Sequence, residues 1–174
     1  DAKGLLKSAI RDDNPVVFLQ AGGRGGQNGE VPDDEYLIDL GQAIKLNSGD
    51  DLTIVAIGSM VQPAVRATKE LSKINISVDL IDPRSLVPLD KNKIFSSVKK
   101  TGKIMIIDEA RDMCSAASHI AALCADECFA HLNAPIKRVT VPDVAVPYSP
   151  PLEKALIPNH EKIVTNAISI MKFS

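Results

Sequence analysis

Residues 79–90 read Asp-Leu-Ile-Asp-Pro-Arg-Ser-Leu-Val-Pro-Leu-Asp, and this stretch decides how the chain folds. A strand is expected over Ser77–Ile81, and it must stop at Asp82-Pro83 because proline lacks the N–H that a strand ladder needs. Arg84 lies on the short turn that follows, and Pro88-Leu89-Asp90 begins a helix. The stretch is therefore a corner at which a strand passes into a helix.

Two further apolar runs, Asp51–Ile57 and Lys103–Ile107, lie on either side of the corner, and helix-period segments separate them from it. Buried strands that alternate with helices predict a parallel sheet, and we place the corner at its middle. A fourth run of this kind is Ile136–Val141. Ala43–Leu46 reads as a short extended piece that a tight turn joins to the first run, so these two are expected to pair antiparallel.

Helical periodicity fills the intervals between the strands. The first expected helix runs from Ser59 to about Lys73, with Ser59 and Gln62 in a capping box. The second begins at the capping residue Asp90 and ends at Gly102. Two more are expected over 115–131 and 161–171. The order β-β-α-β-α-β-α-β-α predicts a three-layer α/β/α sandwich.

The first 32 residues differ from the rest of the chain. Residues 1–13 carry an amphipathic helical pattern, and Val16–Leu19 reads as a short apolar strand. The glycine cluster Ala21–Glu30 fits no phosphate-loop spacing and is followed by Val31-Pro32 rather than a helix start, which favours a flexible linker. We therefore divide the chain into 1–20, the end of a preceding α/β domain, a linker over 21–32, and a main domain over 33–174.

Composition excludes several classes of function. A net charge of -2 argues against a nucleic-acid or membrane-surface role, since phosphate binding needs clustered Lys and Arg. No apolar run approaches the roughly 20 residues of a membrane helix. Three cysteines do not make a secreted disulfide framework, which favours a reducing intracellular compartment.

Acidic residues follow three of the expected strands. Asp82, Asp108-Glu109 and Asp143 would meet at one edge of a parallel sheet, where carboxylates can hold Mg²⁺ and open sheets bind ligands. Acids at strand ends also serve as helix caps and turn formers, and we favour that interpretation. The metal site remains the basis of an alternative function, a free-standing ligand-binding or regulatory domain.

Cysteine and arginine side chains give further candidates. Cys124, Cys128 and His131 share one helix face, but there is no second ligand cluster, so the two cysteines are expected to be core residues rather than zinc ligands. Cys114 lies near a helix start and is the candidate reactive thiol. The planar guanidinium group of Arg84 can bind a carboxylate or phosphate, although we favour an ion pair with Asp108, Glu109 or a partner subunit.

Several sequence blocks recur in the order found in one family. They are Asp-Leu-Thr-Ile-Val-Ala-Ile-Gly-Ser-Met-Val (51–61), Ile-Asp-Pro-Arg-Ser-Leu-Val-Pro-Leu-Asp (81–90), Ser-Val-Lys-Lys-Thr-Gly-Lys (97–103), Ala-Pro-Ile-Lys-Arg-Val-Thr (134–140), Pro-Asp-Val-Ala-Val-Pro-Tyr-Ser-Pro-Pro-Leu-Glu (142–153) and Ile-Pro-Asn-His-Glu-Lys-Ile (157–163).

Together these blocks resemble the C-terminal domain of the E1 β subunit of thiamine-diphosphate-dependent 2-oxo acid dehydrogenase complexes. Asp-Pro-Arg at 82–84 and Asp-Glu-Ala-Arg-Asp-Met-Cys-Ser at 108–115 are most similar to the acetoin dehydrogenase branch, with pyruvate dehydrogenase close behind. Three features depart from the family: Gln20 and the glycine linker, Cys-Ser-Ala-Ala-Ser-His at 114–119, and Asn133 in place of an aspartate associated with E2 docking.

The resemblance implies a transketolase C-terminal-like fold, whose mostly parallel five-stranded sheet has one antiparallel edge strand. It implies a role in subunit assembly and in docking the E2 component, with E1 α, a second E1 β and the peripheral-subunit-binding domain of E2 as partners. Thiamine diphosphate and Mg²⁺ belong to the whole enzyme, so this chain is expected to hold no cofactor, metal or catalytic residue. The expected location is a bacterial cytoplasm or the mitochondrial matrix, and the expected partner-binding residues are Arg84, Asn133, Phe173 and Ser174.

Overall fold

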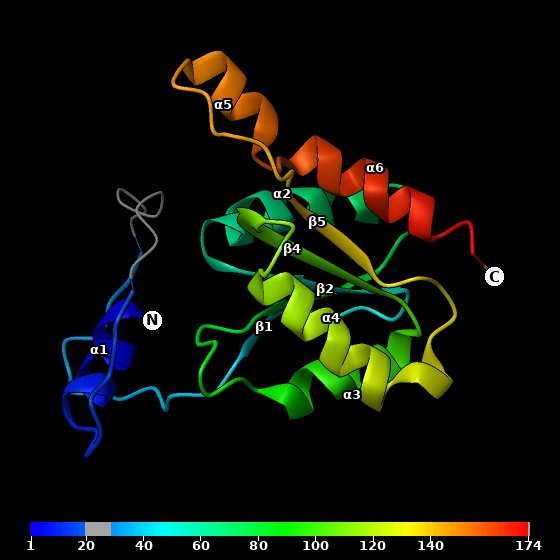
Figure 1. The fold of residues 1–174 in the computed structure, drawn as a ribbon. Helices are drawn as coiled ribbons and strands as arrows, with labels where there is room; N and C mark the ends of the chain where they lie inside the picture. Colours follow the sequence, from blue (N-terminus) through cyan, green and yellow to red (C-terminus); the bar gives the residue numbers. More distant parts are fainter. Residues whose placement is uncertain (20–28, 174) are drawn as a thin grey trace.

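The computed structural model describes residues 1–19 and 29–173. A five-stranded sheet lies between helices that cover both of its faces (Figure 1), so the predicted three-layer α/β/α sandwich is confirmed. The strands follow the order β1-β3-β2-β4-β5 across the sheet. They are β1 Ile44–Asn47, β2 Leu52–Ala56, β3 Val78–Asp82, β4 Ile104–Arg111 and β5 Lys137–Val141.

The described helices are α1 Ala2–Ile10, α2 Val61–Ser72, α3 Lys91–Thr101, α4 Ala116–Glu127, α5 Pro150–Leu156 and α6 His160–Ile170, with short 3₁₀ turns η2 Gly58–Met60 and η3 Phe129–His131. In the part of the chain that the structure describes, no helix has the length and apolarity needed to cross a membrane.

The antiparallel edge strand is present, but its partner differs from the expectation. β1 pairs with β3 rather than with β2, the strand that follows it in sequence. The reason is that β2 has no free edge, because it pairs in parallel with β3 on one side and β4 on the other. β2 therefore occupies the middle of the sheet, and the corner after β3 lies one strand closer to the edge than predicted.

Side chains alternate between the two faces of the sheet, as the period of a strand requires. Leu52 and Ile54 of β2 pack with α2 and α6 in one apolar cluster, whereas Val55 packs with α3 and α4 in the other. All five residues of β2 are buried. The two clusters together form the core on which the remaining chain is built.

Local capping chemistry explains where α3 begins and ends. The Asp90 side chain accepts a hydrogen bond from the Lys93 N–H, and Gly102 ends the helix in the left-handed conformation with φ 69°, both as predicted. The capping box expected at Ser59 and Gln62 is wrong. η2 precedes α2 there, no side chain caps α2, and the Ser59 hydroxyl instead donates to the Glu109 carboxylate.

The N-terminal segment forms a helix but no strand. α1 confirms the helix, whereas the strand expected at Val16–Leu19 is absent from the described residues, and Tyr36–Leu40 pairs with no described strand either. A strand needs a neighbour to satisfy its backbone groups, and no described strand lies beside either piece. Most of the predicted linker over 21–32 lies outside the described residues, which exclude 20–28, so the domain division stays a prediction.

The proline-rich arm after β5 contains a helix that the sequence analysis missed. Pro150 and Pro151 open α5 at the positions where proline fits a helix. α5 has no buried residue, and it projects away from the sheet (Figure 1). Tyr148, just before it, is fully exposed at 102%.

Candidate functional site

Arg84 lies on the corner at the carboxyl end of β3. Its backbone has φ 59°, a left-handed conformation that is uncommon for a residue other than glycine. The Arg84 N–H donates to the Asp82 carboxylate at 2.9 Å, and its guanidinium Nη2 donates to Asp1 Oδ1 at 2.6 Å. The ion pair that we favoured is thus formed with Asp1, at the start of α1, and not with Asp108 or Glu109.

Asn133 lies at the opposite edge of the sheet, in the loop before β5. Its N–H donates to the Gly102 carbonyl oxygen at 2.7 Å, so it is held against the C-terminal end of α3. The residue is exposed. Arg84 follows the carboxyl end of a parallel strand, whereas Asn133 and Gly102 precede the amino ends of two others, so the two residues cannot share one small surface.

Phe173 follows α6 and is 47% exposed. Figure 1 shows the C-terminus at the far end of the molecule from α1, and Arg84 pairs with Asp1 at the start of α1. Ser174 lies outside the described residues. The three described residues, Arg84, Asn133 and Phe173, therefore belong to at least two separate surfaces, and the role of all four predicted residues stays a prediction.

Aspartates at the strand ends accept hydrogen bonds from backbone N–H groups of the protein. Asp108 accepts hydrogen bonds from the N–H groups of Ala110 and Ala117, and Asp143 accepts one from the Met113 N–H. Asp82 accepts from Arg84, as described above. No group of three potential ligands that could hold a metal ion occurs among the described residues.

The cysteines divide between core and surface. Cys124 and Cys128 are buried against the sheet, and Cys114 is exposed. Burial raises the pKa of the Cys124 thiol to about 12, and the neighbouring Cys128 adds to the effect. Burial also raises the pKa of Cys128. Neither thiol is available as a thiolate near neutral pH, which agrees with the predicted core role.

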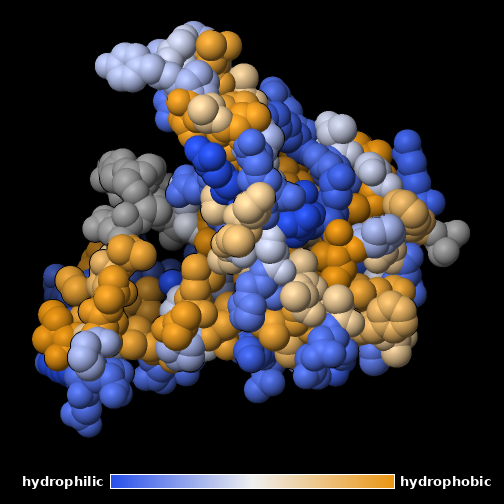
Figure 2. Space-filling view, viewed as in Figure 1, coloured by the Kyte–Doolittle hydropathy of each residue, from blue (hydrophilic) through white to orange (hydrophobic). Residues whose placement is uncertain are grey.

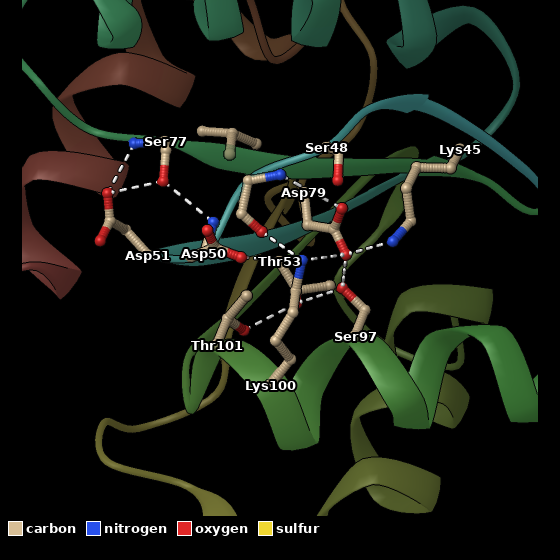
Figure 3. A network of polar contacts seen from close by, with 12 residues as sticks. Lys45, Ser48, Asp50, Asp51, Thr53, Ser77, Asp79, Ser97, Lys100 and Thr101 are labelled. Carbon is tan, nitrogen blue, oxygen red and sulfur yellow. Dashed lines mark hydrogen bonds and ion pairs between the residues drawn. The ribbon is translucent and has the colours of Figure 1, made fainter.

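A buried polar network that the sequence analysis missed lies between the sheet and α3 (Figure 3). The Asp79 carboxylate, fully buried in β3, accepts a hydrogen bond from the Ser97 hydroxyl at 2.5 Å. It also pairs with Lys45 of β1 at 2.9 Å and Lys100 of α3 at 3.4 Å. The Thr53 hydroxyl bridges Ser97 and Thr101 at the base of the network.

The electrostatics of this network favour an ionised Asp79. Burial opposes its ionisation, but the hydrogen bond from Ser97 and the charges of Lys45 and Lys100 outweigh burial and hold its pKa below the usual range. In Lys100, burial opposes the charged form, and contacts with Asp50 and Asp79 outweigh it to raise the pKa. The sequence contains one signal for this network, the charged residue Asp79 inside the buried run Val78–Asp82, but it does not indicate the partners of Asp79.

Two open grooves flank these elements. One, of about 510 Å³, lies between β1 and α3 beside the network and includes Lys45, Lys93 and Lys100. Each of these ammonium groups already contacts a carboxylate. The other, of about 620 Å³, lies between the start of α2 and the junction of α5 and α6, and it includes Met60, Arg66 and His160.

Comparison with known families gives a match to the transketolase C-terminal domain over residues 41–163. The chain is 46% identical over 171 residues to the β subunit of acetoin:2,6-dichlorophenolindophenol oxidoreductase from Bacillus subtilis, covering 98% of this chain and 50% of that protein. It is 40% identical over 175 residues to the pyruvate dehydrogenase E1 component subunit β of the same organism, covering 99% and 53%. The chain thus spans about half the length of these relatives.

Among solved structures, a split-gene transketolase described as an inactive β4 tetramer superposes with a TM-score of 0.69 at 25% identity, over 83% of this chain and 46% of that one. A Pichia stipitis transketolase superposes with a TM-score of 0.52 at 18% identity, over 77% of this chain and 18% of that one. The fold and the named relatives are those that the sequence motifs predicted.

Proposed function

Since the chain belongs to the transketolase C-terminal domain family, we propose that it is the C-terminal domain of the E1 β subunit of a thiamine-diphosphate-dependent 2-oxo acid or acetoin dehydrogenase. The observation that carries this proposal is 46% identity to an acetoin oxidoreductase β subunit over 98% of the chain. The same comparison gives 40% for the pyruvate dehydrogenase subunit, so acetoin is the favoured substrate of the whole enzyme.

We assign the chain a binding role within that enzyme. The whole enzyme would carry thiamine diphosphate and Mg²⁺. The described residues do not fit the ion, since no three acidic, histidine or cysteine side chains gather among them and Asp82 and Asp108 bind backbone N–H groups. Its proposed partners are E1 α, a second E1 β and E2, in a bacterial cytoplasm or a mitochondrial matrix.

Docking of E2 is proposed to use the surface around Asn133. The residue is exposed and fixed against the end of α3, which gives a partner a rigid surface to contact. It stands where the resemblance places an aspartate, so this surface has one negative charge fewer. Exposed charges at the rim of an interface change affinity modestly and in a salt-dependent way.

A calorimetric titration tests this docking. The chain is titrated with the peripheral-subunit-binding domain of a matching E2 at low and moderate salt, and salt-sensitive binding is expected. Asn133→Asp should tighten binding by about threefold, because an exposed ion pair contributes up to about 1 kcal/mol. Asn92→Asp adds the same charge on exposed α3 surface and should leave affinity unchanged.

Two outcomes would count against the docking role. Absence of binding by a folded sample of both the wild type and Asn133→Asp would remove this surface as the E2 site. An equal increase in affinity from Asn133→Asp and from Asn92→Asp would show that only the net charge of the chain affects binding.

A further inference from the structure

The Arg84 corner holds a strained backbone around a largely buried cation. The left-handed conformation of Arg84 is fixed from both sides, by its N–H bond to Asp82 and by a bond of 2.6 Å from the Ser85 N–H to the Pro83 carbonyl oxygen. Such conformations at residues other than glycine persist where the surroundings enforce them, and they cluster at binding and functional sites. The Arg84 side chain is only 13% exposed.

The guanidinium of Arg84 is only half satisfied along one edge. Its Nη2 donates to Asp1 Oδ1 at 2.6 Å, while Nε is buried and has no hydrogen-bond partner among the described residues. The Nε–H and one Nη2–H point in the same direction, and this edge of an arginine binds both oxygens of a carboxylate through two parallel hydrogen bonds. Asp1 therefore already bonds one of the two donor nitrogens of this edge.

The surrounding charge also favours a further acceptor. Burial lowers the pKa of Arg84, because the charged form loses solvation, and the carboxylate of Asp82 only partly offsets this effect. A buried donor without an acceptor carries a desolvation penalty that a second oxygen at Nε would remove.

We propose that Arg84 is a receptor for a bidentate carboxylate, and that Asp1 is an exchangeable occupant that fills half of it. Exchange is feasible because the Asp1 side chain is 42% exposed and its contact with Arg84 uses a single oxygen. This proposal goes beyond E2 docking, since Asn133 lies at the opposite edge of the sheet. The incoming carboxylate is either a small molecule in solution or a side chain of a second copy of this chain.

The site selects a carboxylate over a phosphate on charge and shape. Asp82 lies beside the guanidinium, so a doubly charged phosphate would meet more repulsion than a singly charged carboxylate. A carboxylate also has only two oxygens, which the two donors of this edge satisfy completely.

Nitrogen-15 NMR of the arginine Nε–H groups tests the proposal, with acetate as the probe and chloride keeping the ionic strength constant. The Arg84 resonance, assigned from its loss in Arg84→Lys, should shift with acetate and saturate, whereas phosphate should produce a weaker response. Asp1→Asn removes the internal competitor and should tighten acetate binding by up to about fivefold. Arg66→Lys, which removes an exposed arginine, should leave the Arg84 titration unchanged.

Dilution of the chain without acetate distinguishes the two sources of the carboxylate. If a second copy supplies it, the Arg84 Nε–H resonance moves with protein concentration, and Arg84→Lys weakens self-association in sedimentation experiments. If the ligand is a free carboxylate, the resonance responds to acetate alone. An Arg84 resonance that responds neither to acetate nor to protein concentration, in the wild type and in Asp1→Asn, would overturn the proposal.

Discussion

Asp79 joins α3 to the amino-terminal end of the sheet through a hydrogen bond and an ion pair. Its carboxylate has no exposed surface and joins side chains from β1 and α3. A buried charge is tolerated only when it is paired and hydrogen-bonded, and Asp79 meets both conditions. The polar network thus replaces part of the apolar contact between α3 and the sheet.

Asp79→Asn should lower the free energy of unfolding at pH 7 by about 2 kcal/mol, since charged hydrogen bonds to a buried group are lost. Asp50→Asn is a matched control, because Asp50 also pairs with Lys100 but its side chain is 83% exposed. The control should change stability by less than about 0.5 kcal/mol. Urea denaturation of the three proteins measures this, and equal losses in both variants would contradict the buried role.

The contribution of Asp79 should depend on pH in a defined direction. Its pKa in the folded chain lies below the ordinary aspartate value of 3.8, so the stabilisation is fully present above that value. It is lost as the pH falls through the lower folded value, when the carboxylate becomes protonated. The stability difference between wild type and Asp79→Asn should therefore shrink in denaturation experiments carried out below about pH 4.

Alkylation should separate the three cysteines by their environment. Iodoacetamide at pH 8 is expected to modify Cys114 in the folded chain, while Cys124 and Cys128 react only in denaturant because they are buried and their pKa values are raised. Mass spectrometry should find one added group in the native chain and three after unfolding. Cys114→Ser should remove the native reaction, and native labelling of Cys124 would contradict the buried assignment.

At the scale of the elements, Gly102 shows how one position ends a helix and shapes the next loop. Gly102→Ala should cost at least about 1 kcal/mol, because φ is 69° and an added Cβ would lie 2.3 Å from Asn133 Nδ2. Gly29→Ala, where a Cβ meets nothing within 4 Å, should be neutral. Asn133→Ala in the Gly102→Ala background should recover only the part of the stability loss that comes from the clash with Asn133, and not the part that comes from φ. Thermal melts of these variants measure the two parts.

Elements defined by local chemistry could be predicted from the sequence, whereas those defined by a distant neighbour could not. Asp90 and Gly102 carry their capping roles in their own side-chain and backbone chemistry. The partner of β1 depends on which edges of the other strands remain free, and Val16–Leu19 has strand composition without a neighbouring strand. The same limit applies to Asp79 and Arg84, whose partners come from segments far away in sequence.

At the scale of the whole molecule, the chain consists of a packed body, which begins at Gly41, and an N-terminal appendage, which precedes it. Every residue of the two apolar clusters lies between Ala43 and Met171. The appendage contacts itself through Gly4 and Ile38 and reaches the body through Asp1 and Arg84. Figure 2 shows apolar surface gathered over α1 and the chain beside it, where Ile10, Val17 and Leu19 are exposed.

A chain that begins at Gly41 should therefore keep a cooperative fold. Its circular dichroism melt should show a single transition, because both clusters and the contact from the Ala43 N–H to Asp90 are retained. A broad, gradual melt would contradict the division into body and appendage. Removing the exposed apolar residues of the appendage should also reduce aggregation at high concentration.

The pairing of β1 with β3 has a consequence for how the protein is made. During synthesis β1 leaves the ribosome first, but its partner strand ends at Asp82. That strand is completed roughly 35 residues later, a delay of about 2 to 7 seconds at the usual rate of translation. Throughout that interval β1 has no edge to join, so the nascent chain carries an unpaired strand whose capture by chaperones or by a neighbouring chain competes with native folding.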